Sequence, residues 1–378
     1  MKVLIMHDNL PQHDRSGADF RLWQIIETLV RQHHAVTFVG RDKLANVQYQ
    51  DNLEAIGVNV YNGDANHLRN SGAGADEGTE LNQVLTGRFD IAILTVWFWS
   101  RIPVAEQYFD QIRALSPDTR IAVLTDDRHG LRHHLLGRVT GRPEDFQLAA
   151  DYERREVEIY RNADLVLTIS KAEQEYIEAR SSDTPVLVIP FSVEVRDPKH
   201  AYHERSGLCF IADFDNYAGQ DAVTWFIHDH WPRLSEQIAG LRFTVAGNKA
   251  RQVLSRPLEN VTCLDHLPDL SVVFDTHRVF VSPLRFGTGI STKNVLAMAH
   301  GIPVVTTSVG AQSLQVTDGR ITAVADSVEE FAETVASVYN DESLWNALST
   351  NSLKHISEKF SREALARSVM NALAIVEA

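Results

Sequence analysis

Short apolar runs alternate with amphipathic segments along this chain, and that alternation restricts the fold more than any other feature of the sequence. The run "KVLIM" (2–6) is followed by "FRLWQIIETLVRQHH" (20–34), where apolar residues recur at helical spacing, and then by "AVTFVG" (35–40). A strand–helix–strand unit of this kind is built right-handed on a parallel sheet. Further strand-like runs follow at "GVNVY", "DIAILTV", "RIAVLT", "ADLVLTIS" and "PVLVIP".

Two polar stretches interrupt the alternation. Residues 62–80 lack any periodicity and are predicted to form a long surface loop, with a mobile insertion favoured over a functional lid. Residues 191–207 form a polar, Pro-containing linker, after which a second series begins with "LCFIADFD", "LRFTVAG", "NVTCLDH", "RVFVSPL" and "IPVVTTS". Because 378 residues exceed one typical core, we predict two consecutive α/β domains, at 1–195 and 206–355.

Composition excludes several classes of protein. The formal net charge of −14 argues against nucleic acid as the main partner, because phosphate backbones select basic surfaces. The two cysteines, Cys209 and Cys263, lie in apolar strand-like runs and are expected to be buried free thiols in a reducing compartment. The N-terminal apolar run is too short for a secretory signal, and no run approaches 18 apolar residues. We therefore expect a soluble, cytoplasmic protein.

The stretch "PLRFGTGISTKNVLAMAHGIPVVTTSVG" (283–310) is predicted to run from a glycine-rich turn into a short helix. Ser291 is the expected N-cap, and Gly301 ends the helix before a proline. Lys293 then lies in the first turn, where a cation faces the positive end of the helix dipole and costs a few tenths of a kcal/mol unless an anion is present. Gly287 and Gly289 allow backbone N–H groups to approach a ligand closely.

The charge pattern of this region supports an anion site. No Asp or Glu occurs from Thr276 to Thr317, although the average composition of the chain would place about five or six there. Carboxylates next to a bound diphosphate would repel it, and Arg285 adds a second cation on the other side of the turn. The alternative is an ordinary strand–helix turn with a surface arginine and lysine. We favour phosphate binding, because the glycines, the cap, the cation and the missing acids all agree.

At these residues the sequence resembles the donor-binding motif of the retaining family-4 glycosyltransferases of GT-B fold. The similarity extends to "FIADFDNYAGQDAVTWFIHDHWP" and "LDHLPDLSVVFDTHRVFVSPL", to "HDRSGADFRLWQIIETLVRQHHAVTFV" near the N-terminus, and to "LTDDRHGLR". The resemblance implies two Rossmann-like domains whose parallel sheets face each other across a cleft. C-terminal helices would bridge the domains, with residues 356–378 packing back on the first.

The resemblance also implies roles for particular residues. Arg285 and Lys293 would hold the diphosphate of a nucleotide sugar, and Asp127 and His129 would face the transferred sugar; these four are the candidate catalytic residues. Without the resemblance, His129 would be assigned to a solvated helical face. The candidate donor-binding residues lie in turns and at strand ends: Gly17, Gly247, Leu267, Arg285, Gly287, Thr288, Gly289, Ile290, Ser291, Thr292 and Lys293.

The chain departs from the family pattern where the ribose should bind. Family members carry a glutamate for the ribose hydroxyls, and here that position is Leu296, while Thr288 replaces an earlier glutamate. The family's basic pair after the first strand of the second domain is also absent. Either another group holds the ribose, or nucleotide affinity is weaker, or catalysis is lost.

The predicted function is transfer of a hexosyl-type sugar from a nucleoside diphosphate to an acceptor hydroxyl with retention of configuration. Surface polysaccharide or glycoconjugate synthesis is the expected setting, and the acceptor would be a glycan, a lipid-linked molecule or a protein. The alternatives are a non-catalytic nucleotide-sugar-binding partner subunit and a GT-B-type nucleotide-sugar epimerase. No cofactor or metal is expected, since Asp126 and Asp127 lack a spaced third ligand. "SGADF" (16–20) does not match a nicotinamide-binding fingerprint.

One basic segment has two interpretations. From Arg128 to Arg142 the chain carries four arginines, three histidines and no acid, interleaved with leucines. A solvated helical face is the commoner explanation for such a run. The alternative is contact with an anionic acceptor or an anionic membrane, which would place the protein at the inner membrane face.

Overall fold

The computed structural model describes residues 1–41, 47–62, 77–98, 102–254, 256–265, 267, 269–312, 314, 316 and 319–377. The chain divides into two compact units. Unit 1 comprises Met1–Leu131, Gln147–Ser192 and Glu363–Ala378, and unit 2 comprises Arg132–Phe146 and Val193–Arg362. The C-terminal segment thus belongs to unit 1, whereas residues 132–146, which include most of one helix and the start of the next, are grouped with unit 2.

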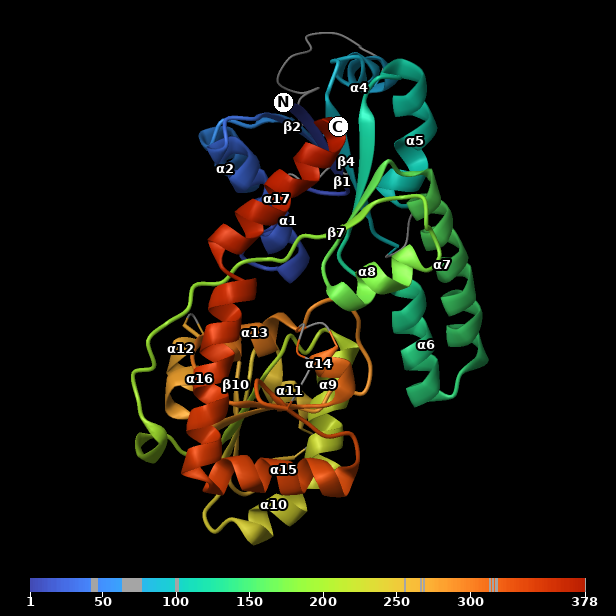
Figure 1. Cartoon of the computed structure of the whole chain (residues 1–378). Helices are drawn as coiled ribbons and strands as arrows, with labels where there is room; N and C mark the ends of the chain where they lie inside the picture. Colours follow the sequence, from blue (N-terminus) through green and yellow to red (C-terminus); the bar gives the residue numbers. More distant parts are fainter. Residues whose placement is uncertain are drawn as a thin grey trace. The chain divides into compact units, whose positions relative to one another are not determined.

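Unit 1 is built on a seven-stranded sheet in which all strands are parallel, in the order β3-β2-β1-β4-β5-β6-β7 (Figure 1). The strands are almost entirely apolar because helices cover both faces of the sheet. Their bounds are β1 (Lys2–His7), β2 (Ala35–Gly40), β3 (Asn59–Asn62), β4 (Ile91–Val96), β5 (Arg120–Thr125), β6 (Leu165–Thr168) and β7 (Val186–Val188).

The helices of unit 1 form two layers. One buried cluster joins the sheet to α1 (Gly17–Arg31), α2 (Val47–Ala55) and α17 (Arg362–Glu377), the last coloured red in Figure 1. A second cluster joins the opposite face to α4 (Glu77–Leu85), α5 (Val104–Leu115), α7 (Pro143–Asn162) and α8 (Lys171–Glu178). The helix α6 (His129–Thr140) follows β5.

One buried arginine links the ends of three strands in unit 1. Arg21 of α1 has no exposed surface, and its guanidinium donates to the carbonyl oxygens of Thr125 (2.9 Å), Thr168 (3.1 Å) and Ile189 (2.8 Å). These residues end β5 and β6 and follow β7. Its charge is balanced by Asp126, whose Oδ1 lies 2.6 Å from Nη1. Such a buried, hydrogen-bonded ion pair stabilises one arrangement of the strand ends, because removing either partner leaves the other charge buried and unpaired.

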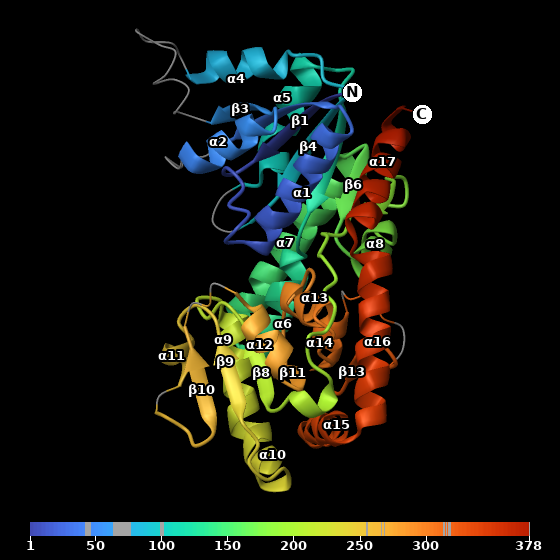
Figure 2. The same cartoon turned by 90° about the vertical axis from the view of Figure 1, so that its left-hand side faces the viewer.

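Unit 2 contains a six-stranded parallel sheet in the order β10-β9-β8-β11-β12-β13 (Figure 2). Its four most buried strands have no exposed apolar residue, as expected for a sheet covered by helices. The strands are β8 (Leu208–Ile211), β9 (Phe243–Ala246), β10 (Val261–Leu264), β11 (Val279–Ser282), β12 (Val304–Thr306) and β13 (Ala323–Val324).

The helices of unit 2 return the chain between these strands. The helix α13 packs on β11 and β12 and against α16, while α15 contacts β11, β12 and β13. Their bounds are α9 (Tyr217–Trp225), α10 (Trp231–Gln237), α11 (Ala250–Val253), α12 (Ser271–Thr276), α13 (Thr292–Ala299), α14 (Ser308–Ala311), α15 (Val328–Asn340) and α16 (Glu342–Lys359). A π-helical segment, Phe226–His230, joins α9 to α10.

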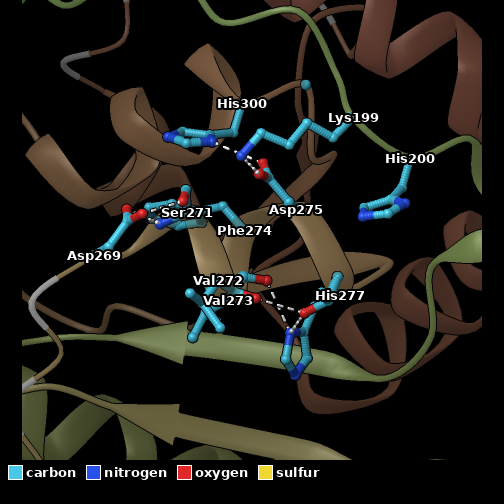
Figure 3. A network of polar contacts seen from close by, with 12 residues as sticks. Lys199, His200, Asp269, Ser271, Val272, Val273, Phe274, Asp275, His277 and His300 are labelled. Carbon is cyan, nitrogen blue, oxygen red and sulfur yellow. Dashed lines mark hydrogen bonds and ion pairs between the residues drawn. The ribbon is translucent and has the colours of Figure 1, made fainter.

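A polar network fixes the C-terminal end of α13 to α12 (Figure 3). Asp275 of α12 lies 3.0 Å from Nδ1 of His300, the C-cap of α13, and 3.1 Å from Nζ of Lys199. Burial opposes ionisation of Asp275, yet the hydrogen bonds from His300 and Lys199 lower its pKa. Burial lowers the pKa of His300 as well. Because this network holds the end of α13 opposite its N-terminus, we assign it a structural role.

The predicted architecture is confirmed, with two Rossmann-like parallel sheets flanked by helices. The prediction of a loop over 62–80 is wrong at its C-terminal end, because α4 begins at Glu77. Residues 63–76 of that prediction lie outside the described residues. Cys209 and Cys263 are free, as predicted, the first buried in β8 and the second half-buried in β10. No helix in the described ranges is both long and apolar enough to span a bilayer.

Candidate functional site

The candidate anion site of unit 2 lies where the order of its strands reverses. From β8 the chain moves outward to β9 and β10, then returns to place β11 on the other side of β8. Loops 212–216 and 283–291, which follow β8 and β11, therefore leave the carboxyl edge of the sheet next to each other. In open α/β sheets, ligands bind outside the carboxyl ends of strands at such a switch point.

The loop from β11 to α13 has the backbone that the sequence predicted. Gly287 and Gly289 have φ values of 151° and 71°, which L-residues with a side chain rarely adopt. Ser291 is the N-cap of α13, but its side chain makes no capping hydrogen bond to the first turn. The first bonds within the helix are donated by Asn294 and Val295 to Ser291 O, so the N–H groups before them have no partner inside the helix.

Two further side chains lie at this helix start. One holds the helix in place, and the other has a buried polar atom without a hydrogen-bond partner among the described residues. Asn294 is fully buried, and its Nδ2 donates to Gly310 O (3.2 Å), which ties the first turn of α13 to α14. The Oγ1 of Thr288 is buried and has no hydrogen-bond partner among the described residues. A buried hydroxyl without a partner is rare in native proteins, and a bound ligand is one explanation for it.

Lys293 places a half-buried ammonium at this helix start. Its Nζ lies 4.9 Å from the ring centroid of Phe210 in β8, and burial lowers the pKa of Lys293 to about 8. No hydrogen bond or neighbouring charge among the described residues offsets that burial. Contact with an aromatic face recovers only part of the lost hydration. The side chain is therefore poised to accept an anion.

The acid-free stretch suggests that Arg285 is an unpaired cation. In the structure it is paired with a carboxylate. Its Nε donates to Oδ2 of Asp221 (2.9 Å), and its Nη2 contacts Oδ1 of the same carboxylate. This hydrogen bond raises the pKa of Arg285, and the arginine side chain remains 37% exposed. The stretch without acids is thus complemented by a carboxylate from α9, 64 residues earlier. The expectation that no carboxylate lies beside the cradle is wrong for Arg285.

The other donor-site candidates of unit 2 lie at the same edge. Gly247, which follows β9, has a φ of 128°, and a Cβ there would lie 1.9 Å from Ala212 O. Only glycine allows this approach between the loops after β8 and β9. Leu267 follows β10 and is half-buried. Ile290 and Thr292 flank Ser291 and are also half-buried.

In unit 1 the predicted residues lie at the corresponding edge of its own sheet. Gly17 is exposed and begins α1, after the N-cap Ser16. Asp19 in the first turn accepts from Gln12 N (3.0 Å) and lies 3.3 Å from Nε2 of His7, which fixes the loop between β1 and α1. The N-terminus of α1 thus already has a carboxylate beside it, that of Asp19.

Asp127 and His129 follow β5 and are both buried, with 3% and 2% of their surface exposed. The imidazole of His129 lies within aromatic contact of Trp97, Phe98 and Tyr152, at centroid distances of 5.7, 5.2 and 6.1 Å. His129 is therefore not on a solvated helical face, the alternative that the sequence left open. Neither side chain has been placed against a sugar, and their catalytic role stays a prediction.

Sequence reasoning missed the residue that holds His129 in place. Glu156 of α7 is buried, and its carboxyl accepts from the backbone N–H groups of His129 (2.6 Å) and Gly130 (3.4 Å). Burial raises the pKa of Glu156 to about 8, against these two hydrogen bonds. A Cβ at Gly130 would lie 2.9 Å from Glu153 N, so the glycine permits the close approach of α6 and α7.

The structure offers no obvious metal site in the part of the chain that it describes. There, no three His, Cys, Asp or Glu side chains come together. Asp126, half of the weak candidate pair, is engaged by Arg21. The absence of a metal requirement stays a prediction.

Comparisons with known proteins agree with the fold. Residues 205–341 match the family model described as glycosyl transferases group 1, and this segment contains every unit 2 residue of the candidate site. A curated relative, an uncharacterised 44.6 kDa protein in the cps region of Klebsiella pneumoniae, is 21% identical over 237 residues. That match covers 59% of this chain and spans 58% of the relative's length.

Solved structures match along the whole chain. Sucrose-phosphate synthase from Thermosynechococcus elongatus gives a TM-score of 0.72 at 14% identity, covering 99% of this chain and 98% of that one. Anabaena HepE in complex with UDP and glucose gives 0.67 at 15% identity, covering 99% of each chain. A TarM variant of S. aureus, with UDP and alpha-GlcNAc-glycerol bound, gives 0.69 at 11%, covering 100% of both. The fold is GT-B.

The raised pKa of Glu156 predicts a pH-dependent stability. Between pH 4.5 and 8 the unfolded chain gives up this proton while the folded protein keeps it, so stability falls as pH rises and levels off above about 8. Each pH unit within this window corresponds to about 1.4 kcal/mol, or roughly 2–4 °C in Tm. We expect Glu156→Gln to remove this slope when Tm is measured from pH 5 to 8.

The matched control is Glu158→Gln on the same helix, whose side chain is 68% exposed. It should leave the dependence of Tm on pH as in the parent. Parallel curves for the parent and Glu156→Gln would show that the carboxyl of Glu156 ionises normally in the folded protein.

Proposed function

We propose that this chain is a glycosyltransferase that moves a sugar from a nucleoside diphosphate to an acceptor hydroxyl with retention of configuration. The GT-B fold and the matched segment 205–341 support a transferase, and the relative in a cps region supports polysaccharide synthesis as the setting. The solved structures with UDP and glucose, or with UDP and alpha-GlcNAc-glycerol, support a nucleotide-sugar donor and a glycan acceptor.

The observation that carries this proposal is the ammonium of Lys293. It lies half-buried in the first turn of α13, where burial depresses its pKa and no carboxylate among the described residues pairs with it. Both the helix dipole and the lost hydration make the unliganded state unfavourable for this charge. A diphosphate would relieve both, because it pairs with the ammonium and accepts from the N–H groups at the helix start.

The proposed chemistry is stabilisation of the leaving group. As the glycosidic bond breaks, negative charge develops on the diphosphate, and Arg285, Lys293 and the helix N–H groups are fixed in place before that happens. Preorganised donors of this kind favour the transition state because they need no reorganisation when the charge appears. Asp127 and His129 are proposed to face the transferred sugar.

A second candidate function is supported by Leu296. Its side chain is half-buried on α13, one turn after Lys293, and a hydrocarbon cannot accept hydrogen bonds from ribose hydroxyls. A chain with this substitution is also consistent with a partner subunit that binds a nucleotide sugar without transferring it.

Incubation with a panel of UDP- and GDP-sugars, with and without glycan acceptors, tests the proposal. Release of nucleoside diphosphate that requires an acceptor is expected, and Lys293→Ala should lower turnover by about 10²-fold. Binding without release would support the partner subunit, and isomerised sugar would support an epimerase. Turnover of Lys293→Ala within a few-fold of the parent would contradict the role of the lysine.

The pKa of about 8 predicts how nucleotide binding depends on pH. Above pH 8 the free protein loses the charge on Lys293, so affinity for UDP or GDP should fall by up to about tenfold per pH unit. In Lys293→Arg the charge persists, because guanidinium does not deprotonate in this range. Calorimetric titration from pH 7 to 9.5 should therefore show a slope for the parent and little or none for Lys293→Arg. A flat parent profile would contradict the prediction that a lysine with a lowered pKa binds the nucleotide.

We also propose that the helical hairpin of α6 and α7 contacts an anionic membrane. Phe146 and Leu148 are 38% and 36% exposed, and Arg138 and Arg142 are exposed nearby in sequence, the second paired with Asp145 at 3.0 Å. Exposed apolar side chains among arginines suit the boundary between lipid headgroups and acyl chains. Vesicle co-sedimentation should recover more protein with anionic than with neutral lipid, and Phe146→Ser should reduce that difference. Equal recovery with both lipids would contradict membrane contact.

A further inference from the structure

The helix α9 presents two side chains to Arg285 from one face. Asp221 and Trp225 are four residues apart, which is about one helical turn, so both point the same way. The carboxylate of Asp221 is buried and engages Nε and Nη2 of Arg285. The Cζ of Arg285 lies 5.5 Å from the ring centroid of Trp225. The guanidinium is therefore fixed by an ion pair and by an aromatic face of the same helix.

The geometry of the ion pair leaves part of the guanidinium available. An arginine has five N–H donors in a planar fork, and Asp221 uses one on Nε and one on Nη2. One N–H of Nη1 and the second N–H of Nη2 form the adjoining edge, and the other N–H of Nη1 points back towards Cδ. Since the side chain remains 37% exposed, this edge can still meet two oxygens of a phosphate.

We propose that Asp221 and Trp225 are positioning residues that aim the Nη edge of Arg285 at the donor diphosphate. This inference rests on the proposed function. A free arginine side chain has many rotamers, so a guanidinium held in advance loses less conformational entropy when a phosphate binds. Asp221 also cancels the charge of Arg285, which leaves Lys293 as the net positive charge in the cradle.

Asp221 thus positions Arg285 and also cancels its charge. Losing the first effect should lower turnover, whereas losing the second should strengthen nucleotide binding. In Asp221→Asn the amide N–H₂ would face a guanidinium N–H, so two-point contact is lost and Arg285 can rotate. The same change leaves Arg285 with an uncompensated charge, which attracts a diphosphate in any orientation. We therefore expect affinity for UDP or GDP to stay within about threefold of the parent or to rise. Turnover should fall about tenfold or more, because orientation matters most in the transition state.

The chain offers a matched control for charge. Asp229 lies in the π-helical segment after α9, is exposed, and acts on Arg285 only through its field. Asp229→Asn removes the same charge without touching the fork, and should leave turnover near the parent value. A loss as large as that of Asp221→Asn would overturn the inference, because charge and not orientation would then explain it.

A double-mutant cycle with Arg285→Ala tests whether Asp221 acts through Arg285. The double variant should turn over no more slowly than Arg285→Ala alone, whereas additive losses would overturn the inference. Thermal unfolding checks that each variant folds. If Asp221→Asn does not fold, Trp225→Leu takes its place; because it keeps the carboxylate, it should lower turnover by a larger factor than it lowers affinity. If Arg285→Ala binds and turns over like the parent, the diphosphate role of Arg285 fails. If that role holds and Asp221→Asn also behaves like the parent, only the positioning inference fails.

Discussion

Parallel strands all end at the same edge of a sheet, and this constraint places every candidate functional residue of the chain. In unit 1 the edge is held by Arg21, which bonds the backbone at the ends of two strands and just beyond a third. In unit 2 it is held by Gly247, whose backbone lies too close to Ala212 for any side chain. Loops that leave such edges begin from fixed backbone, so the side chains that follow can be positioned accurately.

The two edges differ in how their charges are balanced. Arg21 faces Asp126 and is completely buried, so its charge stabilises the fold and is not accessible to a ligand. Arg285 is balanced by Asp221 but keeps an exposed edge, whereas Lys293 is partly buried against an aromatic ring and no described residue supplies a counter-charge. A half-buried ammonium without a counter-charge destabilises the empty protein. A bound anion would pair with this ammonium and recover the free energy that its burial costs in the unliganded protein. The proposed function therefore depends on this residue.

The sequence predicts those parts of the structure that local patterns determine. Alternating apolar runs predict both parallel sheets, and the glycines, Ser291 and Gly301 locate α13 to within a residue, since caps and turns depend on neighbours in the chain. The pairing of Arg285 with Asp221 and that of His129 with Glu156 join residues 64 and 27 positions apart. Nothing near either residue signals its partner. Such pairs arise from the packing of helices on a sheet. The stretch without acids was misleading because an acid that is distant in the sequence can still lie beside it in the fold.

On the proposed function, Leu296 changes where the donor is recognised. A leucine on α13 cannot hold the ribose hydroxyls, so that helix can bind the nucleotide only through its N-terminus and Lys293. A larger share of the binding free energy then comes from contacts with the diphosphate than from contacts with the nucleoside. The diphosphate is the part of the donor whose charge rises as the glycosidic bond breaks, so contacts made there strengthen in the transition state. Contacts with the ribose would be equal before and during the reaction and would add affinity without adding rate. The loss of the glutamate is therefore compatible with transfer, provided that the cations of the cradle are held in place.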